Sequence, residues 1–210
     1  MTVCLLLAAG SSSRMSPGLT FGTDPARPGQ QPETIPKMLL PFNGKTFLQH
    51  VIDEVKKVND TQLLVVTGCF HSQLKEILSA QQIDLVENEN WKEGMGSSIQ
   101  KGIKHIAAEY NGAGNVIILV CDQPYISSFL INELIVTAQQ TGKGIIASSY
   151  NGTAGTPVLF DKKYFDQLVL LDGQFGAKRI VQQFIQDTVT IAFPLGNIDI
   201  DTPEDYEKLN

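Results

Sequence analysis

Residues 115–124 read NVIILVCDQP, an unbroken apolar run that ends abruptly in an aspartate. A similar run at residues 3–9, VCLLLAA, ends in Gly10 and three serines. Continuous apolar runs, unlike alternating ones, are typical of strands that are covered on both faces, as in a parallel sheet. The two segments therefore predict central strands of an α/β sheet at 3–7 and 115–121, with a glycine turn and an aspartate at their carboxyl ends.

The rest of the chain repeats this alternation of strand and helix. Further strands are expected at 62–67, 84–87, 144–148, 156–160 and 188–193. Helical patterns lie between and after them, at 46–58, 72–80, 97–109, 128–141, 164–170, 177–186 and 203–209. This order is the doubly wound α/β pattern, so we predict a single three-layer domain over residues 1–210 with a mostly parallel sheet.

One segment interrupts the pattern. Residues 16–36 (SPGLTFGTDPARPGQQPETIP) contain five prolines and three glycines and have little apolar periodicity. Such composition predicts a flexible insertion loop. A tolerated surface insertion and a lid over a binding site are both compatible with it.

Composition excludes several classes of protein. The 210 residues include 16 basic and 22 acidic side chains, a net charge of −6 that argues against a broad nucleic-acid-binding face. The apolar run at 3–9 is too short to span a membrane, and no basic stretch precedes it as in a signal peptide. Three cysteines far apart fit reduced thiols better than a disulfide framework or a metal site. We expect a cytoplasmic protein with neither nucleic acid nor membrane as a partner.

The first candidate site is the turn after the first strand, residues 7–15 (LAAGSSSRM). Small residues let a ligand approach the backbone, whose free N–H groups bind anions, and Arg14 adds a charge suited to phosphate. The pattern is neither G-x-G-x-x-G nor a P-loop, and a plain strand-to-helix turn would also explain it. Lys37 could meet the same phosphates if the insertion folds back, or it could be a solvated surface lysine.

The second candidate is a set of carboxylates. Asp122 ends the most apolar strand, where α/β proteins bind ligands, and could hold Mg²⁺, or it could cap a turn. Asp199 and Asp201 alternate in residues 196–203 (GNIDIDTP), so both would project to one face of an extended segment. One of them could provide a second carboxylate for the metal, or Asp201 could merely support the helix start at Thr202.

Residues 94–98 (GMGSS) open a helix and could contact a nucleobase or hydroxyl, or simply cap the helix. Trp91 is expected to pack in the core or a loop, and the three scattered histidines receive no role.

Together these motifs resemble the nucleotidyltransferases that act on the molybdenum cofactor, in particular the cytidylyltransferase branch. The likeness runs almost end to end apart from the insertion. The resemblance rests on the motifs LAAGSSSRM with PKMLLPFNGKTFLQHV, then NENWKEGMGSSIQKGI, CDQPYIS, GTPVLF, FGAK and DIDTPEDYEKL. Ala9 fits the cytidylyl branch, which typically has Ala-Ala-Gly where the guanylyl branch has Ala-Gly-Gly.

The resemblance implies a nucleotide-diphospho-sugar transferase-like fold, CTP and the molybdopterin cofactor as substrates, and Mg²⁺ as cofactor. It implies Arg14, Lys37 and Asp122 as catalytic residues, and Asp122 with Asp199 or Asp201 as metal ligands. Thr156 and Pro157 would bind the acceptor. The residues expected to bind the nucleotide are Leu7, Ala8, Ala9, Gly10, Ser11, Arg14, Lys37, Asn88, Ser97 and Ser98. A molybdoenzyme or its insertion chaperone would receive the product.

One motif departs from the family. Residues 173–178 read GQFGAK where relatives often have Gly-Asp-x-Gly-Ala-Arg, so a bidentate phosphate contact is weakened at Lys178. Two alternatives therefore stay open: a transferase that uses GTP or another nucleotide with a different phosphorylated acceptor, and a non-catalytic carrier or chaperone of the cofactor.

Overall fold

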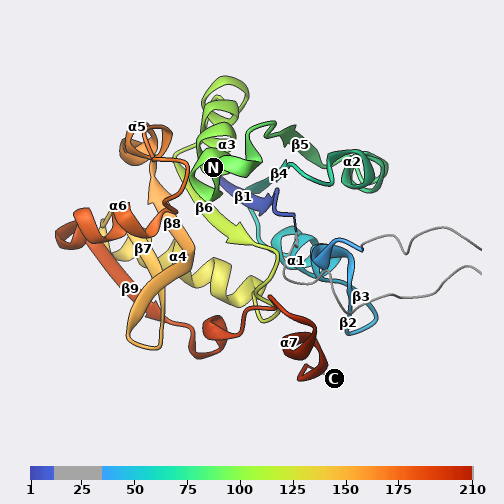
Figure 1. Cartoon of the computed structure of the whole chain (residues 1–210). Coiled ribbons are helices and arrows are strands. Elements are labelled where there is room, and N and C mark those ends of the chain that lie inside the picture. Colours follow the sequence, from blue (N-terminus) through green and yellow to red (C-terminus); the bar gives the residue numbers. More distant parts are fainter. Residues whose placement is uncertain (12–34, 210) are drawn as a thin grey trace, which may run out of the picture.

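The computed structural model describes residues 1–11 and 35–209 (Figure 1). Seven strands form one sheet in the order β5-β4-β1-β6-β8-β7-β9. Their bounds are β1 Thr2–Ala8, β4 Thr61–Thr67, β5 Asp84–Glu87, β6 Asn115–Val120, β7 Ile145–Tyr150, β8 Thr153–Asp161 and β9 Thr188–Ala192. A separate two-stranded hairpin joins β2 (Pro41–Phe42) to β3 (Lys45–Thr46).

The sheet is mostly parallel, as predicted. Strands β5, β4, β1 and β6 run parallel to one another, whereas β8 is antiparallel to both β6 and β7. From β1 the chain builds outward through β4 to β5 and then returns to the other side of β1 with β6. The carboxyl ends of β1 and β6 therefore flank the switch in strand order, which is where sheets of this type bind ligands.

Helices cover both faces of the sheet (Figure 1). One apolar core contains residues of α1 (Phe47–Lys56), α2 (His71–Ala80) and α4 (Ser128–Thr141), and the other contains residues of α3 (Met95–Glu109), α5 (Phe165–Val169) and α6 (Lys178–Gln183). Strand β1 contributes side chains to both cores, because successive side chains of a strand point to opposite faces of the sheet. The prediction of a three-layer α/β fold is confirmed.

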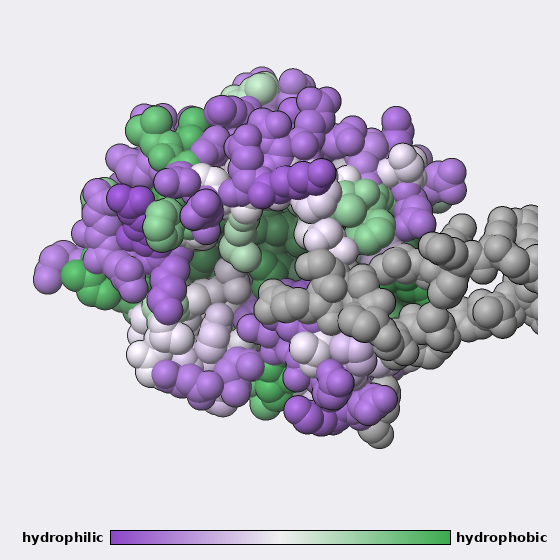
Figure 2. Space-filling view, viewed as in Figure 1, coloured by the Kyte–Doolittle hydropathy of each residue, from purple (hydrophilic) through white to green (hydrophobic). Residues whose placement is uncertain are grey.

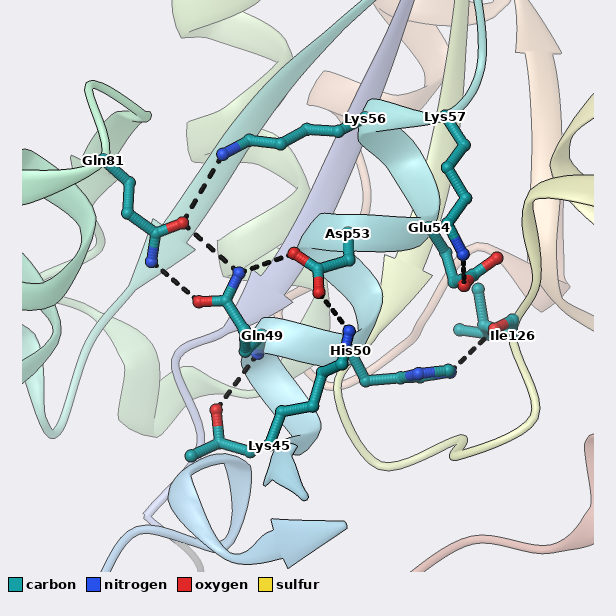
Figure 3. Close-up of polar contacts among 10 residues, drawn as sticks. Lys45, Gln49, His50, Asp53, Glu54, Lys56, Lys57, Gln81 and Ile126 are labelled. Carbon is teal, nitrogen blue, oxygen red and sulfur yellow. Dashed lines mark hydrogen bonds and ion pairs between the residues drawn. The ribbon is translucent and has the colours of Figure 1, made fainter. Parts of the chain in front are cut away.

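Helix α1 shows how one amphipathic element serves both core and surface. Thr46 caps its start by accepting from the Gln49 backbone N–H at 3.1 Å, which satisfies one of the unpaired donors of the first turn. Its polar face carries a hydrogen-bonded cluster in which Gln49 donates to Asp53 at 2.7 Å and accepts from Gln81 at 2.8 Å (Figure 3). The opposite face, with Phe47, Leu48, Val51, Ile52 and Val55, is buried.

The same helix fixes the loop that follows β6. The His50 Nε2 atom lies 3.0 Å from the Ile126 carbonyl oxygen (Figure 3). Glu54 accepts from the Ser128 backbone N–H at 2.7 Å. The loop from Asp122 to the start of α4 is thus tied to α1 at two points.

A third, small apolar cluster joins segments that are distant in sequence. It contains Leu40, Phe42, Phe47, Ile200 and Tyr206. The Tyr206 hydroxyl also donates to the Pro41 carbonyl at 2.7 Å. This cluster packs the segment after the predicted insertion against the C-terminal segment.

One feature differs from what the sequence led us to expect. Asn151 and Gly152 both have positive φ, at 49° and 71°, and turn β7 directly back into β8, so the predicted short strand at 156–160 is the second half of a long antiparallel hairpin. The predicted flexible insertion lies outside the described residues except for Ile35 and Pro36, of which Pro36 is buried. None of the helices in the described part of the chain combines the length and apolar character needed to cross a bilayer.

Candidate active site

A cavity of about 370 Å³ opens at the carboxyl ends of β1 and β6. Figure 2 shows a hollow with a hydrophobic floor at this place, bordered by hydrophilic residues. Seven of the residues predicted to bind the nucleotide line the cavity, and five of them, Leu7, Ala8, Ala9, Gly10 and Ser11, belong to the end of β1 and the turn after it. They do so because β1 and β6 are parallel neighbours, so the chain after each strand emerges at the same edge of the sheet.

The turn after β1 is held against the turn after β4. The Cys69 backbone N–H donates to the Ala9 carbonyl at 3.2 Å. A Cβ atom added to Gly68 would lie 2.7 Å from the Ala9 carbonyl oxygen and 2.8 Å from Trp91 Cβ. Any larger residue at position 68 would therefore push against the wall of the cavity.

Two carboxylates and one lysine meet at this cavity. The Lys37 Nζ atom donates to Asp122 Oδ2 at 2.8 Å and to Asp201 Oδ1 at 2.9 Å. All three side chains are mostly buried, with 18%, 26% and 28% of their surfaces exposed, respectively. The interpretation of Lys37 as a solvated surface lysine is wrong, since the segment after the predicted insertion brings it to the strand ends.

The position of Asp201 follows from the third apolar cluster. Ile200 is buried in that cluster, and its backbone N–H donates to the Asp122 carbonyl at 3.0 Å. The chain at this point therefore runs directly beside Asp122, whereas Asp199 is exposed. Of the two predicted carboxylates, Asp201 is the one that shares Lys37 with Asp122.

The start of α7 (Pro203–Glu207) is capped by other groups. Thr202 accepts from the Asp205 backbone N–H at 3.2 Å, and the Asp205 carboxylate accepts from the Thr202 backbone N–H at 3.0 Å, which completes a capping box. The predicted helix start at Thr202 is confirmed. Asp201 contributes its backbone N–H to this cap, while its carboxylate meets Lys37.

The electrostatics of the site favour a charged lysine. Burial by itself lowers the pKa of Lys37, but the negative charges of Asp122 and Asp201 and the hydrogen bonds to both outweigh burial, so the pKa is raised above its ordinary value. Burial raises the pKa of the neighbouring Cys121 thiol, which therefore stays neutral at physiological pH. The cavity thus holds a permanent ammonium group and no thiolate nucleophile at this position.

Of the three residues predicted to contact the base and ribose, one lines the cavity and two lie behind its wall. Ser98 lines the cavity, whereas Asn88 and Ser97 are not among the lining residues. The Asn88 side-chain amide donates to the hydroxyls of Ser97 and Ser98 at 2.9 and 3.0 Å, and all three side chains are buried. Asn88 and Ser97 therefore brace the wall behind Ser98.

Among the residues that line the cavity are two polar or aromatic ones that the sequence analysis did not assign to the site. They are Trp91 and Lys92, which follow β5, and the Lys92 Nζ atom lies 5.4 Å from the centre of the Trp91 ring. The indole offers a flat apolar surface and the ammonium a positive charge, which together suit a nucleotide. The sequence analysis expected Trp91 to pack in the core or a loop, and the structure corrects this, because Trp91 lines the cavity. The feature of the sequence that could have identified both residues is their position in the loop after β5, a strand of the parallel part of the sheet.

A second cavity of about 230 Å³ adjoins the first, and Met95 lines both. Thr156 and Lys178 lie on its wall among mainly aliphatic side chains, and Pro157, which follows Thr156 through a cis peptide bond, does not line it. The two predicted acceptor residues therefore lie at or beside the second cavity, which adjoins the first. Of the two, only Thr156 lines the second cavity.

Gln123 organises this region, and the sequence analysis gave it no role. It is almost fully buried, accepts from the Thr156 hydroxyl at 3.1 Å and donates to the Gly196 carbonyl at 2.7 Å. These two bonds connect the end of β6 to β8 and to the segment that leads to Asp201. Glutamine can do this because its amide both donates and accepts.

We expect Gln123→Leu to lower the free energy of unfolding by about 1–3 kcal/mol, because it leaves a half-buried hydroxyl and a buried carbonyl without their partner. Gln167→Leu is the matched control, since the buried Gln167 Oε1 has no hydrogen-bond partner among the described residues. Urea denaturation of both variants measures the difference. Equal losses in the two variants would contradict a bridging role for Gln123.

Arg14, predicted to contact phosphate, lies outside the described residues. Among residues 1–11 and 35–209, no cluster contains three histidine, cysteine or carboxylate side chains placed to hold a metal. The Asp122–Asp201 pair nevertheless offers hard oxygen donors, which fit a divalent ion that takes its other ligands from phosphates and water.

A mostly parallel sheet with a small-residue turn, a lysine and two carboxylates at its switch point suits a nucleotidyltransferase, and the match to a family model shows that the chain is one. It belongs to the family with the MobA-like NTP transferase domain, which matches residues 4–189.

A curated relative is similar to this chain in sequence, and two solved structures are similar to it in fold. The purine catabolism protein PucB of Bacillus subtilis (strain 168) is 27% identical over 215 residues, which cover 98% of this chain and 94% of PucB. The structure of Rv0371c from Mycobacterium tuberculosis H37Rv in complex with manganese is 22% identical, covers 99% of this chain and 97% of that one, and has a TM-score of 0.73. Molybdopterin-guanine dinucleotide biosynthesis protein A from Archaeoglobus fulgidus is 13% identical, covers 100% and 96%, and has a TM-score of 0.66.

Proposed function

We propose that this protein transfers the cytidylyl group of CTP to the phosphate of the molybdenum cofactor, a molybdopterin, and releases pyrophosphate. The observation that carries the proposal is that Lys37 and Asp122 line a cavity walled by the turn after β1, and that Asp201 binds the same Lys37 ammonium group. The motif resemblance supports the cofactor as acceptor and cytidine as the base.

The cavity offers a group for each part of a nucleotide. Backbone N–H groups of the turn at Gly10 and Ser11 would bind phosphate oxygens, and Ser98 and Trp91 would contact the nucleoside. Ala9 lines the cavity, and the likeness of Ala8-Ala9-Gly10 to the cytidylyl branch of the family supports cytosine over guanine as the base.

The transfer needs alignment and charge neutralisation rather than a base. A phosphate oxygen of the acceptor forms a bond to the α-phosphorus of CTP, the bond between this phosphorus and the α–β bridging oxygen breaks, and pyrophosphate leaves with the electron pair. The attacking oxygen is already an anion, so no protein group has to remove a proton. Lys37, together with Arg14 as predicted from the sequence, would offset the charge of the departing pyrophosphate. A divalent metal ion held by Asp122 and Asp201, Mg²⁺ in our proposal, would supply further neutralisation of the phosphate oxygens.

The second cavity would receive the acceptor. Thr156 lies on its wall, Lys178 provides a positive charge where relatives have arginine, and Met95 lies where the two cavities join. A substrate that extends from the second cavity would reach the first next to Met95.

Product transfer and location complete the proposal. A molybdoenzyme or its insertion chaperone would receive the dinucleotide product. Cys4, Cys69 and Cys121 are all free thiols, which is compatible with the reducing cytoplasm that we propose as the compartment.

Pyrophosphate release from purified protein tests the proposal. The four nucleoside triphosphates are each supplied with Mg²⁺, with and without the molybdopterin cofactor. We expect release only with CTP and the cofactor together. Release with GTP, or with another phosphorylated acceptor in place of the cofactor, would assign a different member of the family. Cofactor binding without release under any condition would indicate a non-catalytic carrier.

A further inference from the structure

The ammonium group of Lys37 occupies the place between the two carboxylates that the proposed function gives to a metal. Asp122 Oδ2 and Asp201 Oδ1 lie 2.8 and 2.9 Å from the same nitrogen atom. A metal ligated by both oxygens would need the same space, and two cations at this spacing repel each other strongly. Lys37 and a divalent ion therefore compete for one position.

Only the side chain of Lys37 has to move to release the pair. Its backbone lies in a short 3₁₀ turn, Lys37–Leu39, and its carbonyl accepts from the Leu40 backbone N–H at 3.1 Å. Met38 and Leu40, which follow Lys37, are buried and anchor the turn in the core. The flexible four-carbon stem of a lysine can redirect the ammonium while the backbone stays in place.

Charge decides when this movement is favourable. A mostly buried ammonium group that leaves two carboxylates needs another anion, because an unpaired buried charge is costly. Lys37 lines the same cavity as Gly10 and Ser11, where the proposed function places the triphosphate. The entering triphosphate would therefore supply the anion that Lys37 needs on leaving the pair.

We propose that Lys37 excludes the divalent metal from the Asp122–Asp201 pair until a nucleoside triphosphate draws its ammonium group away, so that metal and nucleotide bind as one unit. This inference rests on the metal site of the proposed function. By linkage, whatever removes Lys37 from the pair must strengthen metal binding.

Titration of nucleotide-free protein with Mn²⁺, followed by the electron paramagnetic resonance signal of the free ion, tests this directly. We expect Lys37→Met to bind Mn²⁺ at least roughly tenfold more tightly than the unchanged protein, because the competing charge is gone. Lys92→Met is the matched control: it removes a cation from the wall of the same cavity, but from beside Trp91 rather than from the carboxylates. We expect its affinity for Mn²⁺ to change by less than about threefold.

Three outcomes would overturn the inference. Equal tightening in both variants would show an effect of overall charge, and weaker binding in Lys37→Met would show that Lys37 helps to build the metal site. Tightening that persists in the double variant Lys37→Met/Asp122→Asn would place the ion elsewhere.

A second readout covers the case in which the variant is poorly folded. Lys37→Met leaves two adjacent carboxylates without their cation, so Mn²⁺ should raise its unfolding temperature more than that of the unchanged protein. An equal or smaller rise would overturn the inference. The expected Mn²⁺ results without any pyrophosphate release would refute the proposed function alone, and release without the Mn²⁺ results would refute the exclusion alone.

Discussion

Asp122→Asn is expected to lower the rate of pyrophosphate release by at least roughly 10²–10³-fold, about 3–4 kcal/mol in the barrier. The amide keeps the shape of the side chain but removes the negative charge at the end of β6. It also presents either a weaker oxygen ligand or an N–H donor to Lys37, which has only donors. Single-turnover measurements with CTP, Mg²⁺ and the acceptor would give the size of the loss.

Folding has to be monitored in the same experiment. Asp122 also accepts from the Ile200 backbone N–H through its own carbonyl, and this bond remains in the variant. We therefore expect a circular dichroism spectrum and a thermal transition close to those of the unchanged protein. Full activity in a folded Asp122→Asn protein would remove this carboxylate from the reaction.

Asp201→Asn should cost about 10²-fold in turnover, whereas Asp199→Asn should change it by less than about threefold. The two residues are separated only by Ile200, and the same substitution removes one charge from each. The structure distinguishes them, because Asp201 lies 2.9 Å from the Lys37 ammonium group and Asp199 is exposed. Steady-state kcat and KM for CTP at saturating acceptor would measure both variants.

The contrast between these two variants matters more than either value. A large loss in Asp199→Asn with little loss in Asp201→Asn would transfer the second carboxylate to Asp199. Comparable losses in both would show that the charge of the whole segment, rather than one side chain, supports the reaction.

Much of the site was predictable because its residues follow central strands. The apolar runs of β1 and β6 are long and uninterrupted, so their ends at Ala8 and Val120 could be located to within one residue. Parallel neighbours bring their carboxyl ends to one edge of the sheet, which puts the Gly10 turn and Asp122 together. The turn between β7 and β8 was predictable in principle, because Asn-Gly is the strongest short signal for a hairpin.

Other assignments depended on contacts between distant segments. Trp91 and Lys92 come to the cavity because their loop follows β5 and packs beside the turn after β4. Asn88 and Ser97 lie behind the wall because the Asn88 side-chain amide donates to the hydroxyls of Ser97 and Ser98 rather than facing inward. Local sequence could not decide between these orientations, since polar residues at a helix start serve either purpose.

The sequence by itself determined the layered α/β fold, the glycine turn and the aspartate at the two strand ends, because periodicity and strand order are local properties of the chain. Only the tertiary structure decided that Lys37 and Asp201, which are 164 residues apart, meet beside Asp122. The physical reason is the small apolar cluster of Leu40, Phe42, Phe47, Ile200 and Tyr206. Burial of these side chains against one another draws two remote segments together, and their charged neighbours are carried to the same place.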